Sequence, residues 1–235
     1  REACVYHTFC QSVIQHARKP VSFTPLHQDM LGDFDGQRDG TNAFIYSRYL
    51  VPYLNGFYGA AVFVDGDMHV NSDINDLLDL YDPHYAVQVV KHDYSTRHHR
   101  KYLKTPLEND NVDYPRKNWS SVMIFNCWHP ANRILTPEFV ADAGGSFLHR
   151  FHWLTDDQIG EVPVEWNHLV GEYPENPDAK LYHHTLGTPG FEQYRECESS
   201  KDWNSYLLNA LHLEGERQVD IVRRAQWHSA PTLRR

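Results

Sequence analysis

The sequence predicts one α/β domain in which a mostly parallel sheet lies between layers of helices. Three largely apolar runs, at 60–64, 86–90 and 122–125, have the length of strands. Such runs are typical of strands that are buried on both faces, as in parallel sheets. Segments with helical spacing of apolar residues separate them, and this alternation indicates an α/β sandwich. With 235 residues and a hydrophobic share of 41%, the chain can build one large core, which excludes a disordered protein.

The N-terminal part is expected to open with a helix over residues 4–17. Val5, Phe9 and Val13 recur there every four residues, which is the spacing of one helix face. The next expected elements are, in order, a short strand at 21–23, a loop rich in Gly and Asp at 29–41, and a helix that starts from a Thr41 or Asn42 cap and ends near Pro52.

The same alternation continues after the strand at 60–64. Ser72 or Asp73 is expected to cap a helix. Thr136-Pro137-Glu138 predicts another helix start, because it joins a cap, a proline in the first turn and an acid at the positive end of the helix dipole. The remaining expected elements are the end of that helix at Gly144-Gly145, a strand at 181–184, a helix at 203–213 and a loosely ordered basic tail at 223–235.

Charge and cysteine content exclude several classes of protein. The formal net charge is −9, from 31 acidic and 22 basic residues, which argues against nucleic acid as a partner. No apolar run approaches the roughly 18 residues of a membrane-spanning helix, so we expect no integral membrane segment. The four cysteines form no C-x-x-C pair, which indicates free thiols in a reducing compartment. We expect a cytoplasmic protein, free or peripheral at a membrane.

Asp65-Gly66-Asp67 directly follows the apolar run at 60–64 and carries the strongest local signal of chemistry. Ligands of open α/β sheets bind beyond the carboxyl ends of the strands, which is where these carboxylates are expected. Oxygen ligands at this spacing suit Mn²⁺ or Mg²⁺ shared with a diphosphate. The alternative is a solvated turn, since Asp and Gly are common turn residues.

Several further motifs occur in a characteristic order. They are Ile45–Leu54 with Arg48, the strand that ends in Asp65-Gly66-Asp67, Asn71-Ser72-Asp73-Ile74 with Leu77, Ser120–Asn126, Asp157-Gln158, Glu165-Trp166-Asn167, and His184-Thr185-Leu186-Gly187. In this order they resemble the retaining, metal-dependent glycosyltransferases that include glycogenin and the bacterial lipopolysaccharide galactosyltransferases. The resemblance covers about residues 1–195 and implies the GT-A fold. It implies a single glycosyltransferase domain over 1–235, with a C-terminal helix and tail at about 196–235.

The chain also departs from that family's pattern. Trp119 and Ser121 replace an Asn and a Gly, and Ile159 replaces the second Asp of an Asp-Gln-Asp motif. Gly190-Phe191 stand in place of Lys-Pro, so one phosphate contact is missing from the pattern. These departures suggest a divergent bacterial or viral branch.

The resemblance assigns roles to particular residues. Asp65, Asp67 and His184 would bind Mn²⁺ or Mg²⁺, with the neighbouring His183 as the rival histidine. Asp157 and Gln158 would hold the donor sugar, with Asp157 near the anomeric carbon as an electrostatic stabiliser. The expected contacts to the nucleotide-sugar come from Arg48, Asp65, Gly66, Lys91 and Gly187. The alternatives are a surface arginine for Arg48, ordinary helix-start residues for Asp157 and Gln158, and a plain tight turn at Gly187.

These roles predict a transferase that moves a sugar from a nucleotide-sugar donor, expected to be UDP-linked, to a hydroxyl acceptor. The acceptor would be a glycan, a lipid-linked glycan or a protein, and the resemblance implies retention of the anomeric configuration. Two alternatives use the same acidic strand end: a metal-dependent nucleotidyltransferase or nucleotide-sugar hydrolase, and a sugar- or nucleotide-binding module without catalysis.

Two further expectations concern the basic cluster at 98–104 and the start of the chain. The cluster is either a solvated loop or a contact on the acceptor side; it contains His98-His99-Arg100, Lys101 and Lys104. In the resembling family a buried strand leads directly into the first helix. We therefore expect a natural chain with about 8–12 further residues, forming a strand, before Arg1.

Overall fold

The computed structural model describes residues 2–26 and 44–211. The expected loop at 29–41, the Thr41 or Asn42 cap and the basic tail at 223–235 lie outside the described residues.

The main sheet has four strands in the order β1-β6-β3-β7. They are β1 (Ala60–Val64), β6 (Val122–Asn126), β3 (Val87–Val89) and β7 (Ile159–Glu161). β6 pairs antiparallel with β1 on one side and β3 on the other, while β3 and β7 pair in parallel. Three strands therefore run in one direction, as the expected, mostly parallel sheet requires, and β6 runs against them. Two of the three strand pairs are antiparallel because β6 lies between β1 and β3, so the sheet is mixed.

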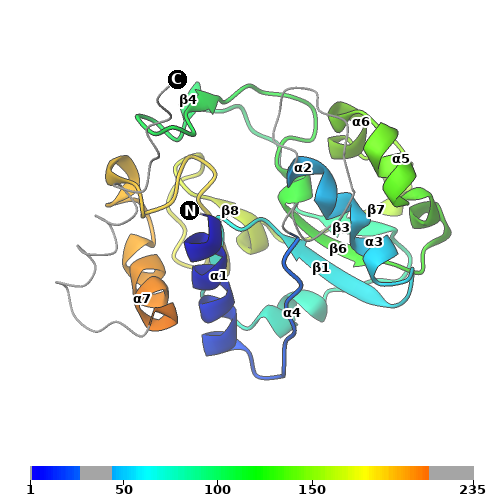
Figure 1. The fold of residues 1–235 in the computed structure, drawn as a ribbon, viewed down its shortest axis with the longest axis horizontal. Coiled ribbons are helices and arrows are strands. Elements are labelled where there is room, and N and C mark those ends of the chain that lie inside the picture. The colour runs from blue at the N-terminus through cyan, green and yellow to red at the C-terminus, as the bar shows by residue number, and fades with distance from the viewer. Residues whose placement is uncertain (1, 27–43, 212–235) are drawn as a thin grey trace, which may run out of the picture.

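Both faces of this sheet are covered, as the apolar runs predicted. Met123 and Phe125 of β6 belong to a buried cluster with residues of the helices on one face, and Val122 and Ile124 belong to the cluster on the other. The first face is covered by α2 (Phe44–Ser47), α3 (Val51–Leu54), α5 (Pro137–Asp142) and α6 (Gly145–His149) (Figure 1). The second cluster takes residues from α1 (Glu2–His16) and α4 (Ile74–Leu78).

A second, smaller sheet was not anticipated from the sequence. Its strands are β2 (Met68–Val70), β9 (Leu181–His183) and β8 (His168–Leu169), in the order β2-β9-β8. β2 pairs antiparallel with β9, and β9 pairs in parallel with β8. Helix α1 packs against β2 and lies beside α7 (Ser200–Ala210), on the side of the molecule away from α5 and α6 (Figure 1).

The other described elements are short. β4 (Arg100–Lys101) and β5 (Asn109–Asp110) form an antiparallel hairpin. Tight helical turns cover Arg48–Leu50, Trp119–Ser121, Pro130–Ile134, Asp156–Gln158, Val164–Asn167 and Glu192–Tyr194. None of the helices in the described part of the chain has the length and apolarity to cross a lipid bilayer.

Most local predictions are confirmed, with three corrections. Asp73 caps α4 by accepting a hydrogen bond from Asn75 N, and Thr136 caps α5. Gly144-Gly145 does not end α5, which stops at Asp142; Gly144 is instead the N-cap of α6, and Gly145 is its first residue. The residues 21–23 form no strand; Val21 and Phe23 instead pack their side chains against the cluster beneath α1. The helix expected to end near Pro52 continues to Leu54, because a proline in the first turn of α3 needs no amide hydrogen.

We expect Gly160→Ala to destabilise the fold. A Cβ at Gly160, in the middle of β7, would lie 2.5 Å from Tyr85 Cδ2 and 2.7 Å from Gln88 Cγ. Such overpacking costs about 1–3 kcal/mol. Urea denaturation should show this loss in the free energy of unfolding. Gly66→Ala is the matched control, since nothing lies within 4 Å of its Cβ position. Equal stabilities for the two variants would contradict the packing described for β7.

Candidate functional site

The turn Asp65-Gly66-Asp67 joins β1 of the main sheet to β2 of the smaller one. Asp65 N donates to Ser121 O at 2.9 Å, which ties one end of the turn to the start of β6. His184 N donates to Asp67 O at 3.1 Å, which ties the other end to the residue after β9. The two carboxylates are therefore held by backbone pairing on both sides, at the carboxyl end of β1 as predicted.

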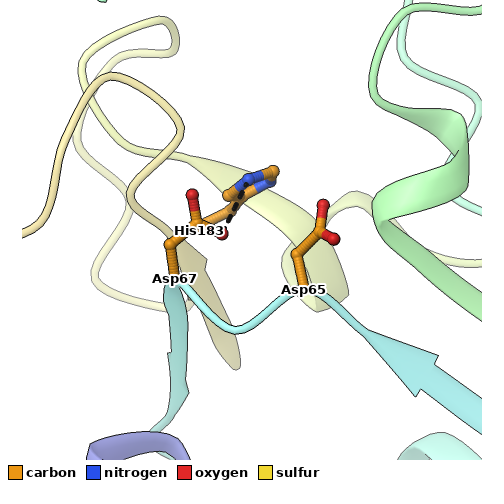
Figure 2. Close-up of side chains that lie close together, drawn as sticks. All are labelled: Asp65, Asp67 and His183. Carbon is orange, nitrogen blue, oxygen red and sulfur yellow. Dashed lines mark ion pairs between the residues drawn. The ribbon is translucent and has the colours of Figure 1, made fainter. Parts of the chain in front are cut away.

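A histidine completes a group of three possible metal ligands. Asp65, Asp67 and His183 each offer one ligand atom, and these atoms lie within 4.8 Å of one another. His183 Nε2 lies 3.4 Å from Asp67 Oδ1, the contact that Figure 2 marks with a dashed line. The carboxylate side chains are 16% and 22% exposed and His183 is 4% exposed, so a bound ion would be shielded from water on the protein side. Two carboxylates and an imidazole are ligands that can bind a divalent metal ion.

The histidine in this group is His183, which corrects the expectation for His184. Successive side chains of a strand point to opposite faces, so neighbouring residues at the end of β9 face different ways. Met68, next to Asp67, pairs with His183 in the register of β2 and β9. Asp67 lies before β2, in the turn, where its Oδ1 comes within 3.4 Å of His183 Nε2, so the rival histidine that the sequence left open takes the position.

His184 faces the opposite side of the small sheet. Its Nε2 lies 3.1 Å from His69 Nδ1, and its Nδ1 lies 3.6 Å from Cys197 Sγ. The rings of Tyr182 and His184 both stack on His69, with centroid distances of 5.1 Å. Burial holds the pKa of His184 well below its usual value. This side chain is packed within the small sheet and does not reach Asp65.

Arg48 holds Asp65 in place. Its Nη2 lies 2.9 Å from Asp65 Oδ1 and its Nη1 lies 3.3 Å from Oδ2, a two-point contact suited to the planar guanidinium. Nη1 also donates to Ser120 O at 2.9 Å, and the guanidinium carbon lies 4.9 Å from the centroid of the Phe63 ring. The resemblance placed Arg48 at the site but on phosphate or sugar. In this structure its guanidinium binds the aspartate instead.

Tyr102 performs the same task for Asp67, and sequence reasoning missed it. Its hydroxyl donates to Asp67 Oδ2 at 3.0 Å. Tyr102 has a φ of 54°, a left-handed conformation that is costly for a bulky residue. The bond from Tyr102 N to Leu186 O, at 2.7 Å, helps to hold it there. Nothing in the local sequence signals this, because the contact joins residues far apart in the chain.

Asn167 orients the imidazole of His183. Asn167 Oδ1 lies 3.1 Å from His183 Nδ1, and Asn167 Nδ2 donates to Ser121 Oγ at 2.8 Å. Ser121 Oγ in turn donates to Asn118 O at 2.6 Å. This chain of bonds assigns the Asn167 oxygen to His183, so Nδ1 carries the proton and Nε2 presents its lone pair beside Asp67. Asn167 is fully buried, as such a role requires.

Burial dominates the electrostatics of the group. Desolvation raises the pKa of Asp65, against the opposing charge of Arg48. Desolvation also raises the pKa of Asp67, against its hydrogen bond from Tyr102. Burial lowers the pKa of His183 to about 4, which keeps the ring neutral and able to bind a cation. Half-buried carboxylates that are close together are stabilised by a bound divalent ion.

Gly66 lies between the two aspartates, and Lys91 lies at the end of a neighbouring strand. A Cβ at Gly66 would meet nothing within 4 Å, so the backbone between the two aspartates is open to a ligand. Lys91 follows the carboxyl end of β3, at the same edge of the sheet as Asp65, and its Nζ lies 6.0 Å from the ring centroid of Trp119.

Gly187 has a packing role that differs from the expected one. Its amide donates to His184 O at 2.9 Å, so this N–H does not face a phosphate. A Cβ there would lie 2.3 Å from Tyr194 Cε2, and the φ of +149° disfavours other residues. The turn is kept free of a side chain by the Tyr194 ring, which corrects the prediction of a phosphate contact.

Asp157 and Gln158 lie away from the group, contrary to expectation. They precede β7, and Gln158 O accepts a hydrogen bond from Ala86 N at the beginning of β3. Because β1, β3 and β7 run in the same direction, this is the opposite edge of the sheet from Asp65. Gln158 Oε1 accepts from Thr155 N at 3.0 Å in a local cap, and Asp157 is exposed. The structure thus supports the alternative of ordinary residues at a helical turn.

We expect the two histidines to respond differently to substitution. His183→Gln should weaken Mn²⁺ binding at least about tenfold, since it removes the imidazole from the ligand group. His184→Gln, which keeps a polar partner for His69, should bind Mn²⁺ like the wild type. Isothermal titration calorimetry with folded variants measures both. The reverse order of effects would restore the original assignment.

Asn167→Leu should weaken Mn²⁺ binding by about 10–100-fold, the usual effect of losing the partner that orients a metal-binding histidine. The loss arises because His183 Nδ1 no longer has an acceptor and the ring is free to turn. Asn204→Leu, far from the group on α7, serves as the control. Unaltered Mn²⁺ affinity in Asn167→Leu would exclude this orienting role.

No family model matches this chain, but its fold is similar to that of solved structures. The fold resembles the WbbM bifunctional glycosyltransferase in its apo form, with a TM-score of 0.57 and 16% identity over 94% of this chain. The match spans only 50% of the WbbM chain. The galactosyltransferase LgtC, solved with donor and acceptor sugar analogs, gives a TM-score of 0.50 and 10% identity, over 94% of this chain and 96% of that one. These likenesses show the mixed α/β fold of GT-A glycosyltransferases.

One relative is similar in sequence as well. Protein CDI of Arabidopsis thaliana is 38% identical over 237 residues, which cover 94% of this chain and 87% of that protein. It is a plant protein, so the relatives of this chain are not confined to the bacterial or viral branch that the sequence departures suggested. Because the identity extends over nearly the whole length, the chain belongs to the family of Protein CDI.

Proposed function

We propose that the protein is a metal-dependent glycosyltransferase. It transfers a sugar from a nucleotide-sugar donor, expected to be UDP-linked, to a hydroxyl group of a glycan, a lipid-linked glycan or a protein. The observation that carries the proposal is the Asp65-Asp67-His183 group at the carboxyl end of β1, in a fold shared with solved glycosyltransferase structures. Solved structures of that fold include one with donor and acceptor sugar analogs bound.

The donor set fits a small divalent cation, Mn²⁺ or Mg²⁺. Arg48 and Tyr102 each engage one of the two aspartates, and Asn167 fixes the ring of His183, so the ligand atoms are oriented before an ion arrives. When bound, the ion would act as a Lewis acid that neutralises the diphosphate leaving group. The open backbone at Gly66 and the cation of Lys91 at the same edge of the sheet provide room and charge for the donor.

The proposal includes retention of the anomeric configuration, which rests on the family resemblance of the motifs. It also places the protein in a compartment that supplies nucleotide-sugars, which we expect to be the cytoplasm. Nuclear magnetic resonance of the first transfer product gives the configuration directly.

A screen of nucleotide-sugars tests the function. Thermal melting is measured with UDP-, GDP- and CMP-sugars, with and without Mn²⁺, and donor turnover is then followed with and without sugar acceptors. We expect one donor to stabilise the protein only when Mn²⁺ is present and turnover to rise with acceptor. Acceptor-independent turnover would indicate a hydrolase, and binding without turnover a binding module.

Asp67→Asn should reduce kcat/KM for the donor at least about a hundredfold, since it removes a ligand of the ion that offsets leaving-group charge, an effect of several kcal/mol. Asp157, an exposed residue at the other edge of the sheet, provides the comparison. The variant Asp157→Asn should retain near-normal turnover of the donor. A large loss in Asp157→Asn with little loss in Asp67→Asn would contradict this assignment of the site.

A further inference from the structure

We propose that Lys101 on β4 is a donor-binding residue, which contacts the diphosphate of the nucleotide-sugar directly. This inference rests on the proposed function and adds a residue to its site. The sequence left two interpretations of the basic cluster at 98–104, a solvated loop and a contact to the substrate. Under this proposal Lys101 contacts the substrate, and the exposed residues of the cluster belong to a solvated loop.

The hairpin of β4 and β5 presents its two basic residues to different surroundings. Arg100 faces outward, where its guanidinium forms ion pairs with Glu108 and Asp110, and its side chain is 49% exposed. Lys101 is half-buried, and Tyr102, which directly follows β4, donates to Asp67 Oδ2. This end of the hairpin therefore lies beside the two aspartates.

The charge of Lys101 acts on the candidate site. Burial lowers the pKa of Lys101, and the opposing attraction comes first from Asp67 and then from Asp65. No carboxylate within the described residues forms an ion pair with Lys101, in contrast to Arg100 and Lys117. A buried cation without a close counter-ion is costly unless an anion is bound beside it.

Apart from Lys91, the other charges described at the site are already engaged. Arg48 binds both oxygens of Asp65, and a divalent ion would take the two carboxylates and His183. The two carboxylates already offset the charge of a divalent ion, so the two negative charges of a bound nucleotide-sugar diphosphate need further cations. Lys101 can meet this charge together with Lys91, as a point charge with three donors.

The hairpin is fixed well enough to position such a contact. Tyr102 N donates to Leu186 O at 2.7 Å, and Leu103 N donates to Tyr194 Oη at 2.9 Å. These bonds tie the residues after β4 to residues that follow β9. His183 is the last residue of β9. Lys101 therefore keeps its place relative to the ligand group.

The test separates two affinities with calorimetry. Binding of Mn²⁺ alone is measured first, and binding of UDP and of inorganic pyrophosphate is then measured at saturating Mn²⁺. The variants are Lys101→Met and Lys101→Gln, with Lys104→Met as the matched control, because Lys104 is an exposed lysine of the same segment. Circular dichroism and thermal melting confirm that each variant is folded.

We expect the affinity for the diphosphates and the affinity for Mn²⁺ to respond differently. Loss of Lys101 should weaken binding of both diphosphates by about 10–100-fold, the effect of losing one charge-assisted hydrogen bond. Mn²⁺ affinity should stay equal or rise, since a cation that repels the ion is removed. Lys104→Met should leave both affinities unchanged.

Each other outcome overturns the proposal in a recognisable way. If the wild type binds Mn²⁺ and the diphosphates and the Lys101 variants bind the diphosphates equally well, this role fails and the proposed function stands. If the folded variants lose Mn²⁺ affinity as well, Lys101 shapes the metal group and does not bind the donor. If the wild type binds neither Mn²⁺ nor the diphosphates, the proposed function fails together with this inference.

Discussion

The candidate site depends on one constraint, the backbone pairing that holds the turn 65–67 between two sheets. Asp65 N donates a hydrogen bond to Ser121 O, next to β6 of the main sheet. Asp67 O accepts a hydrogen bond from His184 N, next to β9 of the small sheet. Shifting either pairing by one residue would turn the side chains at the strand end to the opposite face. In the observed pairing Met68 lies opposite His183, and the turn before Met68 brings Asp67 Oδ1 within 3.4 Å of His183 Nε2.

Around this turn, each ligand is held by a partner from a different part of the chain. Arg48 comes from the segment between α2 and α3, Tyr102 follows β4, and Asn167 precedes β8. Contacts of this kind orient the ligand atoms before an ion binds, and they raise the affinity of a site without adding ligands. The group is the meeting point of both sheets and the hairpin, which explains why its partners are so far apart in sequence.

The parts of this arrangement that the sequence predicts are those set by local chemistry. An apolar run of strand length followed by Asp65-Gly66-Asp67 indicates a strand end with two carboxylates, whatever the partners are. The caps of α4 and α5 are equally local, and both are found. The choice between His183 and His184 depends on the register of β2 with β9, and the role of Tyr102 depends on where the hairpin folds. Pairing between distant segments leaves no periodic signal in one sequence.

A match to a motif of the resembling family does not always place the matching residues at the candidate site. Asp157-Gln158 match a motif, yet here they belong to a short helical turn that directly precedes β7, and they stay at the edge of the sheet where that strand begins. Gly187 also matches, but the ring of Tyr194 accounts for the glycine through packing alone. Strand direction places Asp157 and Gln158 at the edge of the sheet opposite Asp65. The hydrogen bond from Gly187 N to His184 O shows that this amide does not face a phosphate.

The most direct measurement of the central claim is the anomalous scattering of manganese in crystals grown with Mn²⁺ and UDP. The account predicts a single strong peak bound by Asp65, Asp67 and His183, at about 2.0–2.4 Å from each ligand atom. A peak beside His184, His69 and Cys197, or diphosphate density at the edge of the sheet that carries Asp157, would contradict it.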